Sequence, residues 1–180
     1  MSPILGIFAS SKFAAAGDYE SIATVTVGSG GSATVEFTSI PADYTHLQIR
    51  AIARNTSDVY YVALQINSDT GANYAYHRLS GDGSAASAGA GSSENQIYLY
   101  PQANTANMFS GGVIDILDYK NTNKYKTVRA LGGYDQNGSG RIELVSGLWQ
   151  STSAITSLKF SAFAGNYGQY SHFALYGCKI

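Results

Sequence analysis

An alternation of apolar and polar side chains with a period of two residues recurs along most of this chain, and it constrains the fold more than any other feature. From Glu20 onward, short segments place apolar residues at every second position, which buries one face of a β-strand and leaves the other in water. No segment shows the apolar stripe of an amphipathic helix. The alternation predicts a core made of Val35 and Phe37, Leu47, Ile49 and Ala51, Val62, Leu64 and Ile66, Ile97 and Leu99, Ile114 and Ile116, Ile142 and Leu144, Leu158 and Phe160, and Phe173 and Leu175.

Clusters of turn-forming residues separate these segments. They lie at 28–31, 41–43, 69–71, 81–83 and 135–138 and are rich in Gly, Asp, Asn and Pro. Connections this short join antiparallel neighbours, whereas parallel strands need long crossovers. We therefore expect an all-β fold, an antiparallel β-sandwich of jelly-roll type with roughly eight or more short strands.

Two stretches depart from the alternation. Residues 113–117 are apolar on both faces except for Asp115, which predicts that the second sheet covers one face and a neighbouring subunit the other. Asp115 then needs a partner, and Arg50, Arg54 and Arg129 are the candidates. Residues 80–93 are almost entirely Gly, Ala and Ser around Asp82, and this composition predicts a long surface loop.

The length and apolar content suit one domain. A chain of 180 residues that is 44% hydrophobic can bury a sizeable core, so we expect a single β-sandwich domain over 18–180. Residues 1–17 are apolar, contain Ala and Gly and lack a helical stripe, which predicts an extended N-terminal arm. Such an arm suits packing against a neighbouring chain, and an added edge strand is the alternative. The predicted interface with neighbouring chains comprises Ile4, Leu5, Ile7, Phe8, Phe13, Val113 and Leu117.

The charge content argues against two classes of partner, and the cysteine content argues against an internal disulfide. Only 13% of the residues are charged and the formal net charge is −1, so nucleic acid and anionic membranes are not expected partners. Cys178 is the only cysteine, so packing and strand pairing rather than a disulfide must stabilise the fold.

No motif for catalysis or metal binding is present. The three histidines, His46, His77 and His172, lie on separate segments without the spacing of a zinc site. Aspartates near turns suit calcium, but turn geometry alone also favours them, and no calcium-loop spacing occurs. We therefore expect no catalytic residue, no metal and no cofactor, and a protein that is not an enzyme.

Aromatic residues offer two interpretations. The chain has 14 tyrosines and one tryptophan spread over strands and turns. Flat aromatic rings beside amides are typical of sugar-binding surfaces, and tyrosine is equally typical of subunit interfaces. The interface is the favoured interpretation, and the possible glycan-binding residues are Tyr60, Tyr74, Tyr76 and Trp149.

Seven segments carry a resemblance to a known family: 2–7, 19–31, 37–41, 44–50, 115–119, 123–129 and 169–177. They resemble small structural virion proteins of tailed bacteriophages, common among phages of aquatic bacteria, and the likeness runs nearly end to end. The resemblance implies a jelly-roll domain, often a homotrimer, that serves as a capsid decoration (cement) protein or a fibre module. It implies no catalytic residues.

The choice between a decoration protein and a fibre module rests on the organisation of the chain. Fibre modules carry shafts, heptads or repeats, and none is visible here. We therefore expect a decoration protein on the outer surface of the phage head that binds itself and the major capsid protein or another virion protein. The alternative is a receptor-binding tail fibre, or another carbohydrate-binding module, that recognises host glycans.

Overall fold

The structure is a computed structural model that describes residues 18–57 and 61–179, and within them every regular element is a β-strand. None of these residues belongs to a helix long and apolar enough to cross a bilayer. The strands are β1 (Tyr19–Thr26), β2 (Thr34–Phe37), β3 (His46–Ala53), β4 (Tyr61–Ile66), β5 (Tyr74–Gly81), β6 (Ala86–Glu94), β7 (Ile97–Pro101), β8 (Ser110–Leu117), β9 (Lys126–Asp135), β10 (Gly140–Trp149), β11 (Leu158–Ala162) and β12 (His172–Cys178).

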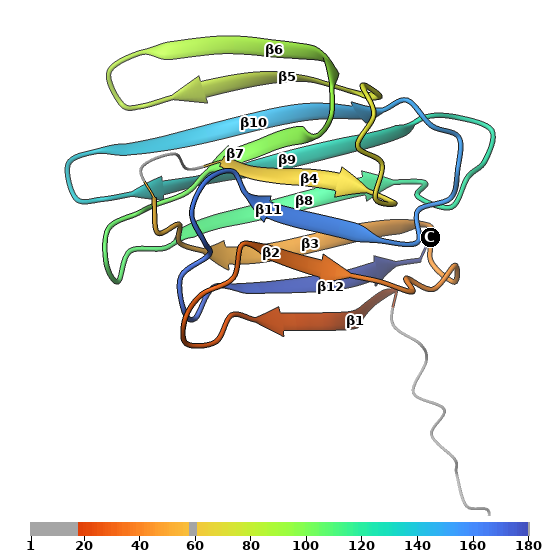
Figure 1. Cartoon of the computed structure of the whole chain (residues 1–180). Coiled ribbons are helices and arrows are strands. Elements are labelled where there is room, and N and C mark those ends of the chain that lie inside the picture. Colours follow the sequence, from red (N-terminus) through yellow and green to blue (C-terminus); the bar gives the residue numbers. More distant parts are fainter. Residues whose placement is uncertain (1–17, 58–60, 180) are drawn as a thin grey trace, which may run out of the picture.

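The strands form two antiparallel sheets that pack face to face (Figure 1). The large sheet has eight strands in the order β1-β12-β3-β8-β9-β10-β5-β6, and the small sheet has four in the order β2-β11-β4-β7. The set β1-β12-β3-β8 facing β2-β11-β4-β7 is the strand order of a jelly roll, in which the chain passes repeatedly between the two sheets. The predicted all-β sandwich is therefore confirmed.

Two hairpins are added to this eight-strand framework. β5–β6 lies in the chain between β4 and β7, and β9–β10 lies between β8 and β11. Both hairpins extend the large sheet on the β8 side, so the large sheet continues past the edge of the small one (Figure 1). One end of the molecule is consequently a single sheet rather than two packed layers.

Glycines on the inner face of the large sheet make room for large side chains of the facing layer. The Tyr100 ring of β7 lies against Gly112 of β8 and Gly132 of β9, where a Cβ atom would come within 2.2 and 2.5 Å of it. Gly147 accommodates Ile97 in the same manner. This pairing of small and large residues lets the sheets approach closely, because interiors are packed to near-crystalline density.

The predicted core is correct except on β10. Sixteen of the eighteen predicted core residues are buried, but Ile142 and Leu144 are 58% and 51% exposed. β10 turns Glu143 and Val145 inward instead, so its alternation has the opposite phase. The reason is that β10 lies toward the overhanging end of the large sheet, where Arg141 forms an ion pair with the inward Glu143.

The long loop predicted over residues 80–93 is wrong. These residues contain the end of β5, a short turn and most of β6. β6 pairs with β5 from Ala86 to Glu94, so backbone hydrogen bonds hold it rather than a buried apolar face. Its Gly, Ala and Ser residues carry no periodic apolar signal, and composition alone therefore hid the strand. The predicted arm over residues 1–17 lies outside the described residues.

Adjacent glycines on β8 test the seat of Tyr100. We expect Gly112→Ala to destabilise the fold by about 1–3 kcal/mol, because the new methyl group would overlap the buried Tyr100 ring. Gly111→Ala is the matched control, since a Cβ there meets no atom within 4 Å, and it should change stability by less than about 0.5 kcal/mol. Urea denaturation of both variants measures the difference, and equal effects would contradict the packing described above.

Candidate interaction surface

The outer face of the large sheet, which points away from the small sheet, carries a row of apolar side chains. Strand register places Val113, Leu131, Leu144, Leu79 and Ala88 side by side across β8, β9, β10, β5 and β6. Neighbouring strands lie about 4.8 Å apart, so this row extends roughly 19 Å. Nothing in the described chain covers these side chains, and all five are exposed.

A second apolar row lies beside the first. It consists of Ile52, Gly111, Gly133, Ile142, Gly81 and Ala86, again in direct register. We call the six large members of the two rows, Ile52, Leu79, Val113, Leu131, Ile142 and Leu144, the apolar strip. Together with Leu117 they are all seven of the exposed large aliphatic side chains in the described residues. A contiguous patch of this kind marks an interaction site more often than scattered exposed residues do.

A groove of about 860 Å³ lies at one end of the apolar strip. Gly111 leaves a depression beside the strip residues Val113, Leu131 and Ile142, and Phe109 adds an aromatic ring to the lining. Because glycine has no side chain, a ligand backbone or ring can lie directly on the sheet there.

Two aspartates in turns form the rim of the groove. The Asp82 carboxylate accepts hydrogen bonds from the backbone N–H groups of Ser84 and Ala85, and these bonds lower its pKa. Asp135 likewise accepts the N–H of Asn137 at 2.7 Å. Both carboxylates therefore stabilise their own turns, and the floor they flank is apolar. No group of three or more His, Cys, Asp or Glu side chains gathers anywhere in residues 18–57 and 61–179.

A polar row borders the apolar strip on its other side. It contains Gln48, Asp115, Arg129 and Ser146, in register across β3, β8, β9 and β10. Asp115 accepts a hydrogen bond from Gln48 Nε2 at 2.8 Å, and Arg129 donates one to Ser146 Oγ at 2.6 Å. The predicted arginine partner of Asp115 is therefore wrong. A half-exposed carboxylate on the outer face needs only an amide, since water reaches it too.

On the small sheet, the outer face is polar across β2, β11 and the Gln65 end of β4, while aromatic side chains lie toward β7. Lys159 of β11 lies between Glu36 of β2 and Gln65 of β4 in strand register, and Thr34 and Ser161 form the next pair. The molecule therefore has two unlike outer faces. Such asymmetry is expected when one face is covered by a partner and the other stays in water.

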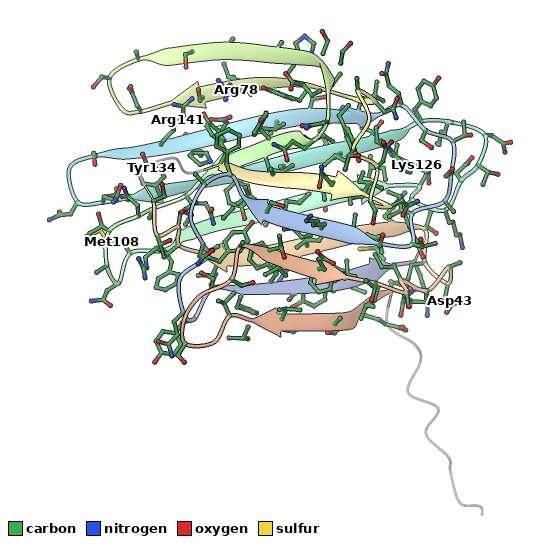
Figure 2. All side chains as sticks on the ribbon, in the orientation of Figure 1. Asp43, Arg78, Met108, Lys126, Tyr134 and Arg141 are labelled. Atoms are coloured by element: carbon green, nitrogen blue, oxygen red, sulfur yellow. The ribbon has the colours of Figure 1, made fainter. Side chains whose placement is uncertain are left out.

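A cluster of charged and aromatic residues lies where β5 and β10 pass beyond the small sheet (Figure 2). Glu143 is fully buried and lies 3.1 Å from Arg141 Nε and 3.7 Å from Arg78 Nη1. Burial raises the Glu143 pKa, while both arginines oppose that shift. The Arg78 guanidinium also lies 5.2 Å from the centre of the Tyr61 ring.

Aromatic rings continue from this cluster onto β7. Tyr98 contacts Tyr61, Tyr76 and Phe163 in edge-to-face geometry, with centroid distances of 6.1, 5.6 and 5.3 Å. Phe163 is exposed. The combination of a partly exposed arginine and aromatic rings suits recognition of a planar or acidic group.

The residues predicted as interaction sites are distributed unevenly. Ile114 and Ile116 are buried against the second sheet, as predicted, whereas Val113 and Leu117 are exposed on the outer face, where cover by a neighbouring subunit stays a prediction. Ile4, Leu5, Ile7, Phe8, Phe13 and Tyr60 lie outside the described residues. Tyr74 and Trp149 are 0% and 2% exposed and Tyr76 is also buried, so these rings cannot stack on a sugar in this structure.

Burial explains the misplaced aromatic residues. The Tyr74 hydroxyl donates to the backbone oxygen of Asp69, and Trp149 Nε1 donates to the Asp69 carboxylate at 2.8 Å. Burial of Asp69 opposes its charge, but hydrogen bonds from Trp149, Asn73 and Gly71 outweigh that effect and lower its pKa. These hydrogen bonds hold the turn before β5 against the core.

Sequence reasoning missed most of the apolar strip. Leu79 and Leu131 were not singled out, and Ile142 and Leu144 were assigned to the core. On β10 the residues that flank Ile142, Arg141 and Glu143, are charged. Charged side chains are seldom buried, so the sequence alone favours the phase in which Ile142 and Leu144 face inward, which is not the observed one.

Comparison with protein-family models, with curated proteins and with solved structures finds no match to this chain.

Neighbouring residues on β10 test which face is exposed. We expect Leu144→Gln to change the free energy of unfolding by less than about 0.5 kcal/mol, because the side chain already meets water. Val145→Gln should cost about 2–4 kcal/mol, since it buries an amide in the core. Binding of a hydrophobic dye should fall in Leu144→Gln. Equal destabilisation by the two substitutions would contradict the assigned phase of β10.

Proposed function

We propose that this chain is a non-enzymatic structural virion protein of a tailed bacteriophage, a capsid decoration protein that binds and stabilises the head lattice. The observation that carries the proposal is the contrast between the two outer faces. The apolar strip supplies a surface to bury, and the polar face with Glu36 and Lys159 suits exposure at the particle surface. The jelly-roll framework and the family resemblance of the sequence support the same role.

The mechanism follows from a rigid body that bridges neighbouring subunits. Cement proteins bind many equivalent lattice sites, so that modest contacts at each site add up through multivalency. The broad outer face of the eight-stranded sheet suits a shallow site where capsid subunits meet. Burying the apolar strip there would resist separation of the subunits under internal DNA pressure. Self-association of the chain is part of this proposal.

A second candidate is recognition of host surface glycans, and the aromatic cluster on the small-sheet side favours it. Tyr61, Tyr98 and the exposed Phe163 offer ring faces, and Arg78 offers a cation for an acidic sugar. This site lies apart from the apolar strip, so one protein can hold both functions.

Co-sedimentation separates the two candidates. Purified protein is mixed with capsids that lack it and, separately, with host polysaccharide. We expect saturable capsid binding by the wild type and at least about a tenfold weaker affinity in Leu131→Lys/Leu144→Lys, which places two charges in the strip. The control is Glu36→Lys on the opposite face, which should bind normally. Glycan binding without capsid binding would replace the decoration role with receptor recognition.

Removal of residues 2–13 tests the role proposed for the arm. We expect the truncated protein to fold, because the described core contains none of these residues, yet to lose most of its affinity for the particle. Thermal unfolding and capsid co-sedimentation are measured on the same sample. Unchanged capsid binding would remove the arm from the proposed mechanism.

A further inference from the structure

Within residues 18–57 and 61–179, each sheet of this sandwich ends in two edge strands whose outward backbone groups face no further strand. The edges are β1 and β6 in the large sheet and β2 and β7 in the small one. An edge strand presents alternate N–H and C=O groups that can pair with another chain, and monomeric proteins usually obstruct such edges. The four edges here differ in how far they are obstructed.

Three edges carry features that hinder pairing. β1 has a bulge between Ser21 and Ala23 and a charged residue, Glu20. β2 is only four residues long and contains Glu36. β7 has five residues, ends at Pro101 and is irregular in its pairing with β4. Short length, charge, proline and bulges are the usual means of protecting an edge.

β6 has none of these features over most of its length. It is nine residues long, and Glu94 at its end is its only charged residue. Its register with β5 is continuous from Ala86 to Ser92, and the one irregularity lies beyond, opposite Tyr74. On its outer face Ala88 and Ala90 are exposed. The strand is therefore a long, regular and neutral edge, and no other strand of the described residues pairs with its outward side.

We propose that β6 pairs antiparallel with β6 of a second copy of this chain, joining two large sheets into one continuous sheet. Antiparallel pairing of identical strands creates a two-fold axis, in which each edge supplies both donors and acceptors to the other. The axis is perpendicular to the sheet, so the outer face of one copy continues into the outer face of the other. This inference does not depend on the virion role.

The side chains of β6 favour a second copy over a foreign peptide. Peptides that add to a sheet edge gain specificity from pockets that hold alternate side chains. β6 offers no such pockets, because Tyr76 and Arg78 of β5 fill the space over Gly91 and Gly89 on its inner face. Its small side chains instead suit pairing with another strand of equally small residues.

Pairing through β6 also has a consequence for the outer face. Leu79 and Ala88 form the end of the first apolar row, next to the edge. The two-fold axis would therefore bring the apolar strips of both copies onto one surface, with β6 and its mate between them. A partner would then meet a double-length strip.

Paired charges on β6 test the proposal. Under any register that keeps the outer faces continuous, Ala88 and Ala90 lie opposite small outer-face residues near the axis. Ala88→Lys/Ala90→Lys then sets like charges against one another and should raise the dimer dissociation constant at least about tenfold. Ala88→Glu/Ala90→Glu should do the same, and an equimolar mixture of the two variants should restore a dimer of one each.

Two controls locate the contact. Thr24→Lys/Thr26→Lys adds the same charges to exposed sites on the opposite edge strand, β1, and should leave the dimer intact. Leu131→Lys in the apolar strip should also leave it intact, whereas a dimer formed face to face through the strip would dissociate. Sedimentation equilibrium gives the masses, and amide exchange should show protection of residues 86–92 that is lost in the lysine variant.

The outcomes are distinct. A wild-type dimer that responds to charge only on β6 supports the proposal. A monomer at high concentration, a trimer, or a dimer indifferent to the β6 lysines would overturn it. Capsid binding is measured separately, so loss of the dimer and failure of the decoration role are distinguishable.

Discussion

The seating of Tyr100 between Gly112 and Gly132 is the contact on which the arrangement of the two sheets depends. Tyr100 belongs to β7, the edge of the small sheet, and the glycines belong to β8 and β9, where the framework gives way to the added hairpins. A single ring thus fixes how far the small sheet reaches across the large one. Beyond that point the cover decreases from β10, where Val145 and Trp149 are still buried, to β6, whose residues are mostly exposed.

That partial cover explains the two chemical features of the hairpin end. On the inner face, charged residues replace aliphatic ones, and Glu143 is held by Arg78 and Arg141. On the outer face, Ile142 and Leu144 of β10 are exposed and belong to the apolar strip. The inward charges and the outward leucines of β10 are therefore two aspects of one strand phase. A partner that binds the strip completes the burial that the fold itself leaves undone.

Sequence periodicity was sufficient for most of the framework, because strands such as β3 and β12 bury one face against a second sheet and must alternate. It failed for β6, whose pairing rests on backbone hydrogen bonds that side-chain patterns do not record. It failed for β10 because alternation shows that every second residue faces inward but not which set does. Either Ile142 and Leu144 or Arg141 and Glu143 can face inward. Likewise, aromatic content could not separate the buried Tyr74 from the exposed Phe163, since both types of site favour flat rings.

The buried Glu143 has a consequence for the specificity of folding. A one-residue slip of β10 would turn Ile142 and Leu144 inward, which is the arrangement that hydrophobicity alone prefers. The slip would also separate Glu143 from Arg78 across the β5–β10 pairing and place the carboxylate and Arg141 on the wet face. The ion cluster therefore favours the observed register over the slipped one. In this strand, the charged residues select the native alignment and leave apolar residues at the surface, where they are available for association with other molecules.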